Sequence, residues 1–152
     1  MALDQQTEMS RAETDALLAR NETGVLSLAR DDEPYAIPIS YGYDAEARTF
    51  YLRLVSTPES EKREFLNSSP AVRLVVSEET EPEYRSVVAK GTLREVSTDE
   101  MTVERIEQFG DAKRPLFEIW GDSKTDLRIQ LYELDADDVS GRFIELDPSE
   151  YA

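Results

Sequence analysis

The chain has 152 residues and is strongly acidic, with 33 Asp and Glu against 17 Lys and Arg and a net charge of −16. Its length and its 39% hydrophobic content predict one domain, residues 1–152, with a single core. The absence of Cys and His excludes disulfides, thiolate nucleophiles, iron–sulfur clusters, histidine-ligated haem and the usual zinc centres. No metal site is expected, and a bound cofactor is the best source of chemistry.

The charge distribution bears on partners and location. Acidic residues occur along the whole chain, so its surface is expected to repel nucleic acid and anionic lipid. Only four lysines are present, and an acid-rich, lysine-poor surface resembles those of proteins from salt-loving (halophilic) organisms. No apolar stretch is long enough for a membrane helix, and the polar segment 1–20 is unlike a secretory signal. A cytoplasmic location without a membrane partner is expected.

The first half of the chain predicts one helix and three strands. Ser10 and Glu13 form a capping box, which begins a short helix that ends near residues 21–24. Alternating apolar positions then predict strands over Gly24–Arg30, Tyr35–Tyr43 and Thr49–Leu54. Short turns join these strands, so we expect an antiparallel meander.

The second half predicts two more helices and four strands. Capping boxes at 56–59 and 97–100 begin helices that end near Asn67 and at Gly110, and residues 111–121 suit a short helix or a turn. The remaining strands are Ala71–Ser77, Tyr84–Val96, Thr125–Leu134 and Asp138–Leu146. The fold class is therefore mainly β with short helices (α+β), and the meander connections favour a small closed barrel over an open sheet.

The strand Tyr35–Tyr43 has one face of small residues, which are Ala36, Pro38, Ser40 and Gly42. Because Pro38 has no N–H to donate, the strand must be an edge or open locally at that point. Such a flat face leaves room for a planar ring beside free backbone groups. The same pattern is also typical of an edge strand that a proline protects against aggregation.

A local basic island lies at the start of the second helix, within residues 54–63. Lys62 and Arg63 are adjacent, Arg53 lies just upstream, and Ser60 adds a hydroxyl donor. Free N–H groups at a helix N-terminus, Arg and Lys together suit a phosphate dianion. A capped helix with solvated charges explains the same residues, and the pattern alone does not separate the two. Further along, Gly91 inside a strand pattern indicates a bulge or a close backbone approach.

The order of these segments resembles the pyridoxamine 5′-phosphate oxidase-like flavoproteins, and most closely their nitroimidazole-resistance-type branch. The runs Gly24–Ala29 and Glu33–Tyr41 are similar to the opening hairpin of that family. Thr49–Arg53 and Ser60–Lys62 are similar to its aromatic strand and its phosphate-binding turn, and Ser86–Gly91 to the strand that follows.

This resemblance implies a split β-barrel that binds FMN between the two subunits of a homodimer. The implied phosphate contact is Lys62, helped by Arg53, Ser60 and Arg63. Pro38, Ile39, Ser40 and Tyr41 would line the isoalloxazine ring, and Ser86 would lie near its polar edge. Trp120 would cover the flavin from the second subunit, although a core tryptophan fits the sequence equally well.

The chain departs from the family pattern at several positions, and these departures limit which of the family's activities can be expected for it. The true oxidases carry Arg-x-x-Leu-Leu-Lys where this chain has Ala36–Tyr41, and the histidine that nitroimidazole-resistance proteins often carry is absent from Tyr51–Arg53. The first hypothesis is an FMN-dependent oxidoreductase acting on an unknown small molecule or electron donor. The alternatives are a deazaflavin (F420)-dependent reductase and a non-catalytic flavin-binding or regulatory dimer. The candidate acid–base groups are Tyr41, Tyr43 and Tyr84.

Overall fold

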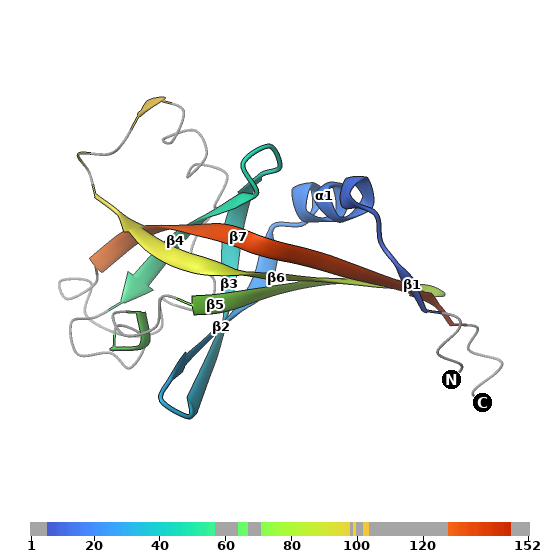
Figure 1. The fold of residues 1–152 in the computed structure, drawn as a ribbon, viewed down its shortest axis with the longest axis horizontal. Coiled ribbons are helices and arrows are strands. Elements are labelled where there is room, and N and C mark those ends of the chain that lie inside the picture. Colours follow the sequence, from blue (N-terminus) through green and yellow to red (C-terminus); the bar gives the residue numbers. More distant parts are fainter. Residues whose placement is uncertain are drawn as a thin grey trace.

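A computed structural model describes residues 6–56, 64–66, 71–97, 99, 102–103 and 128–146. In this part of the chain the helix α1 (Arg11–Arg20) and a short helical stretch at residues 64–66 accompany seven strands (Figure 1). The strands are β1 (Gln6–Glu8), β2 (Thr23–Arg30), β3 (Glu33–Asp44), β4 (Thr49–Ser56), β5 (Ala71–Thr80), β6 (Glu83–Val96) and β7 (Arg128–Glu145). The mainly β class predicted from the sequence is confirmed. No helix in these described ranges is long and apolar enough to cross a membrane.

The capping box predicted for α1 is present. The Glu13 N–H donates to the Ser10 hydroxyl oxygen (3.2 Å), and the Ser10 N–H donates to the Glu13 carboxylate (3.1 Å). These two bonds satisfy N–H groups that the first helical turn leaves without partners. Leu17 and Leu18 are buried, and the helix therefore covers part of the core.

The antiparallel pairings run around six strands, because β7 pairs with β4 on one side and with β6 on the other. Two of the ladders are short. β3 and β4 share only four residue pairs, from Tyr41↔Leu52 onward, and β2 and β5 share only three, ending at Ser27↔Arg73. The barrel is split at these two places, and below each place is called a fork.

The core lies inside the barrel, where alternate residues of each strand meet. Its largest fully buried side chains include Phe50, Leu26, Ile39, Leu52, Leu54, Leu74 and Leu134. Residues 64–66 are helical, and Phe65 and Leu66 are buried as the sequence predicted. Phe65 stacks on Tyr35, with the ring centroids 4.8 Å apart.

The C-terminal strand differs from the prediction. β7 is one continuous strand of 18 residues, so the prediction of two separate strands was wrong. Lys90 pairs with Asp138 but Gly91 pairs with Ala136, which leaves Asp137 as an extra residue. This β-bulge accommodates the polar stretch 135–138 without ending the ladder. A Cβ on Gly91 would collide with the Asp135 carbonyl, which confirms the close backbone approach predicted at this glycine.

Two other stretches differ from expectation or fall outside the description. β5 continues beyond its predicted end at Ser77 to Thr80, and a tight turn at residues 81–82 leads into β6. β1 was not predicted, and it forms only by pairing with the end of β7, which lies beside it in Figure 1. Most of the helix predicted after Ser97, and the segment 111–121, lie outside the described residues.

Candidate functional site

The small-residue face predicted on β3 extends across the outside of the barrel. Pro38 lies opposite Val25, Val25 opposite Val75, Val75 opposite Val88, and Val88 opposite Ser140. This is called the neutral row. Side chains that face each other across strands share one side of the sheet, so the row crosses five strands, and it contains no charged residue. Val25 is 40% exposed although it is a large apolar residue.

The fork between β3 and β4 opens beside this row. The Tyr41 N–H donates to the Glu22 carbonyl (3.0 Å), so it points toward β2. The N–H and C=O groups of successive residues in a strand point to opposite edges. The available backbone groups of Ala36, Pro38 and Ser40 therefore point toward the fork. Pro38 thus stands where its missing N–H breaks no ladder bond, which confirms the local opening predicted from this proline.

The side chains of Ile39 and Tyr41 point the other way, into the core. Ile39 is 1% exposed, and the buried Tyr41 hydroxyl donates to the Leu18 carbonyl (2.7 Å). Ser40 is also buried, opposite Thr23. A ligand at the fork would therefore meet the backbone groups of Pro38 and Ser40, not the side chains of Ile39 and Tyr41.

The other predicted contacts are only partly described. Arg53 is partly buried on β4, one residue beyond the last pair with β3, so it flanks the fork. Ser86 is partly buried on β6, where it lies opposite Ser77 and Arg142. The structure thus brings Arg53 to the Pro38–Tyr41 segment and places Ser86 two positions from Val88 of the neutral row. The remaining predicted contacts, Ser60, Lys62, Arg63 and Trp120, lie outside the described residues.

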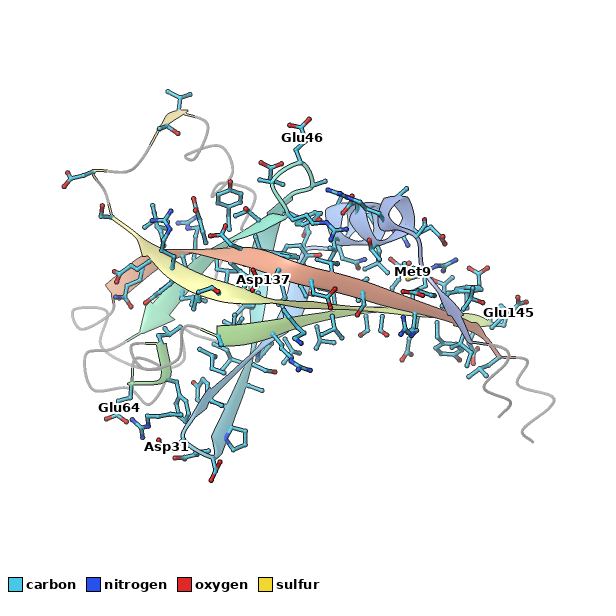
Figure 2. The ribbon with its side chains drawn as sticks, in the orientation of Figure 1. Met9, Asp31, Glu46, Glu64, Asp137 and Glu145 are labelled. Atoms are coloured by element: carbon cyan, nitrogen blue, oxygen red, sulfur yellow. The ribbon has the colours of Figure 1, made fainter. Side chains whose placement is uncertain are left out.

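Sequence reasoning missed a groove at the second fork, between β2 and β5. Its volume is about 530 Å³, and residues of β2, β5, β6 and β7 line it. The polar residues among them are Ser27, Arg73, Lys90, Asp137 and Asp138, and Asp137 lies near the middle of β7 in Figure 2. Gly91 was the available signal, because it marks the bulge that places Asp137 here, but the pairing of β5 with β6 could not be read from it.

The candidate acid–base tyrosines are held in the protonated form. Burial raises the pKa of Tyr41 well above its ordinary value. Burial also raises the pKa of Tyr43, whose hydroxyl donates to an Asp15 carboxylate oxygen at 2.6 Å. The pKa of Tyr84 is raised as well, by desolvation and by Glu81 and Glu79. None of the three is suited to accept a proton near neutral pH.

Comparison with known proteins settles the family. A family model described as pyridoxamine 5′-phosphate oxidase matches residues 10–143. The chain belongs to this family. The family predicted from the sequence is thereby confirmed. A curated relative, protein RA0666 of Rhizobium meliloti strain 1021, is 32% identical over 89 residues. That match covers 58% of this chain and 56% of the relative, so the chain spans about half the length of the relative that it matches.

Solved structures share the fold of this family member over most of its length. An FAD-binding protein of Mesorhizobium loti is 24% identical with a TM-score of 0.71, covering 92% of this chain and 99% of that one. An FAD-binding protein of Mycobacterium smegmatis is 17% identical with a TM-score of 0.64, covering 93% and 100%. A candidate 5-nitroimidazole antibiotic resistance protein of Bacteroides thetaiotaomicron is 16% identical with a TM-score of 0.65, covering 91% and 87%. These similarities confirm the predicted split-barrel fold.

Proposed function

We propose that this family member binds a flavin, FMN, at the fork between β3 and β4, and acts as a flavin-dependent oxidoreductase on a small molecule. The observation that carries the proposal is the open edge of β3 at Pro38, with Arg53 on the opposite side of the fork. The names of the solved relatives from M. loti and M. smegmatis support a flavin ligand.

The residues of the fork fit the two chemically different parts of a flavin. The small side chains of Ala36 and Pro38 let a planar ring approach the strand, and their backbone groups point toward it. The Arg53 guanidinium suits a phosphate group. Lys62 and Arg63, which follow β4 in the sequence, are the proposed additional phosphate contacts.

The neutral row supports a homodimer with the flavin at its interface. A chain with a net charge of −16 repels its own copies unless they meet on a surface without carboxylates. Pro38, Val25, Val75 and Val88 provide such a surface directly beside the fork. A two-fold axis through this row would bring the same residues of both copies together, as isologous interfaces require.

In this proposal the flavin and the protein side chains have different chemical roles. The flavin supplies the electron transfer when it is bound. The chain binds and orients it through the β3 backbone and Arg53, and the packed face of a second copy would exclude water. Because Tyr41 and Tyr43 stay protonated, they act as hydrogen-bond donors to Leu18 and Asp15.

The first test of this proposal is the identity of the cofactor. We expect the purified protein to be yellow, and chromatography with mass spectrometry of the released cofactor should identify FMN. Recovery of FAD would show that the cofactor is FAD, as in the M. loti and M. smegmatis proteins, and not FMN. Recovery of F420 would favour the deazaflavin reductase. A protein that neither retains nor takes up any of them would contradict the proposal. Turnover with NAD(P)H and an acceptor then distinguishes an oxidoreductase from a non-catalytic flavin-binding dimer.

Two variants test the placement of the flavin. Arg53→Gln should weaken FMN binding about tenfold or more, and Lys62→Ala with Arg63→Ala should do the same, since hydrogen bonds to charged groups contribute about 1.5–3 kcal/mol each. The matched control is Arg11→Gln, which removes an exposed arginine from α1 and should leave FMN affinity unchanged.

The dimer has its own test. Val25→Glu introduces a carboxylate into the neutral row and should convert the dimer to monomers in sedimentation experiments. Val103→Glu is the matched control, because Val103 is 75% exposed and lies outside the sheet. A Val25→Glu protein that remains dimeric would show that the interface lies elsewhere.

A further inference from the structure

The second fork has a charge arrangement that the flavin proposal does not use. β2 and β5 stop pairing after Ser27↔Arg73, and the 530 Å³ groove begins there. Arg73 lies directly opposite Lys90 on β6, and Lys90 lies opposite Asp138 on β7. Two cations therefore stand side by side on the outer face, next to the neutral row. Like charges directly opposite each other destabilise a sheet, so this pair is unfavourable for folding.

Among the described residues, neither cation has a side-chain partner, although the chain is rich in acids. Neither Arg73 nor Lys90 makes a hydrogen bond or an ion pair with any side chain that the structure describes. Asp137 and Asp138 line the same groove without pairing with them. Most other described arginines do pair, and the clearest pairs are Arg20–Glu78, Arg30–Glu64, Arg85–Glu83 and Arg94–Glu133. The groove thus carries two cations and two carboxylates, and Arg73 and Lys90 form its positive end without a direct ion pair to any described side chain.

The walls of the groove fit a small ligand. The volume of 530 Å³ lies within the range of small-molecule sites. The Ser27 hydroxyl belongs to the same lining and adds a hydrogen-bond donor. Arg offers a planar fork and Lys a point charge, which together suit a phosphate or carboxylate group. The aspartates at the β7 side would repel a second anionic group.

We propose that this groove binds a small organic anion whose single phosphate or carboxylate group lies between Arg73 and Lys90. The rest of the ligand extends toward Asp137 and Asp138 and is neutral or carries hydrogen-bond donors. This site lies at the β2–β5 fork, beside the neutral row, whereas the flavin is proposed at the β3–β4 fork.

The test titrates the whole protein with inorganic phosphate and, separately, with acetate at constant ionic strength, while amide NMR shifts are recorded. We expect saturable shifts at Ser27, Arg73 and Gly91 with at least one of the two anions, and the comparison identifies the preferred group. Arg73→Gln combined with Lys90→Gln should weaken this binding about tenfold or more. Arg142→Gln, the matched control, should bind like the wild type.

Several results would overturn the proposal. Absence of saturable shifts at these amides would do so, as would equal affinity in the double variant. Shifts confined to the region of Arg53 would place the anion at the other fork instead. If the double variant changes the monomer–dimer equilibrium while no anion binds, the cations contact a second copy and the proposal fails. Should the double variant not fold, Lys90→Gln alone, at an exposed position, provides the comparison.

Discussion

The barrel opens at two forks, and the two are built differently. At the β3–β4 fork, Pro38 has no N–H on the side that faces the opening, and one cation, Arg53, flanks the opening. At the β2–β5 fork the described strand residues include no proline, and the ladder ends at Ser27↔Arg73, beside the cations Arg73 and Lys90. The first opening contains a local backbone restriction that the sequence shows, whereas the second lies where two strands diverge.

The difference teaches which openings of a barrel are visible in a sequence. A proline acts at its own position, so its effect on the ladder follows from one residue. A divergence of strands depends on registers set by partners far along the chain, here by β6 and by the bulge in β7. The charged groove at the second fork could therefore be found only in three dimensions.

The largest expected effect is a difference in unfolding free energy between substitutions on the two faces of β3 at the first fork. Ile39→Ala removes a fully buried side chain and should lower the free energy of unfolding by about 3 kcal/mol. Pro38→Ala, on the exposed side of the same strand, should change it by about 0.5 kcal/mol or less. Urea unfolding measures both, and similar losses for the two variants would contradict the assigned faces.

At the second fork, Gly91→Ala tests whether the bulge shapes the groove. The new Cβ would meet the Asp135 carbonyl and the Ala136 Cα, which are backbone atoms that cannot move easily. We expect a loss of about 2–3 kcal/mol in thermal or urea unfolding, together with weaker anion binding. Thr92→Ala, at the exposed neighbouring position, is the control and should be nearly neutral. A fully stable Gly91→Ala protein would disprove the close approach.

A smaller effect concerns the far end of β5, the strand that forms one side of the second fork. Hydrogen bonds from Arg20 and Asn21 lower the pKa of Glu78 to about 2, well below its ordinary value of 4.5. Because the folded pKa is lowered, this contribution is present above pH 4.5 and is lost as the pH falls toward 2. Arg20 is about half exposed, so we expect only about 1 kcal/mol.

The Glu78 contribution can be isolated by comparing unfolding of Glu78→Gln and wild type at several pH values. The two stabilities should differ near pH 6 and converge as the pH approaches 2. Glu79→Gln, at the next and exposed position, should match the wild type throughout. A difference between Glu78→Gln and wild type that persists at pH 2 would assign the effect to packing.

The smallest expected effect is the response to salt, which should have opposite signs in the fold and in the groove. Added NaCl screens the repulsion within a chain of net charge −16, so the folded state should become more stable. The same screening should weaken phosphate binding between Arg73 and Lys90. Thermal unfolding and phosphate titration over one NaCl series measure both, and parallel trends would argue against a cationic groove.

Much of the fold was predictable because its signals are local. The Ser10–Glu13 capping box fixed the start of α1, and alternation located β2, β3, β4, β5 and β6. Features that depend on distant parts of the chain were not predicted. β1 is too short and polar to be recognised without its partner on β7, and Asp135–Asp138 has the composition of a turn although a bulge keeps it in the strand.

The candidate site shows the same division. Pro38 and the family resemblance pointed to the β3–β4 fork, and the register between β3 and β4 then placed Arg53 beside it. That the side chains of Ile39 and Tyr41 face the core follows from which face of β3 is buried, a property of the assembled barrel. Arg73 and Lys90 are 17 positions apart in sequence and became neighbours only through the β5–β6 register.

The pairing of β7 with β1, β4 and β6 has a consequence for biosynthesis. A ribosome delivers β7 after the other six strands, so until it emerges β4 and β6 each present an edge that no strand covers. The barrel can therefore close only after β7 has emerged from the ribosome. Before β7 emerges, the high negative charge of the nascent chain repels neighbouring copies while the edges of β4 and β6 are exposed.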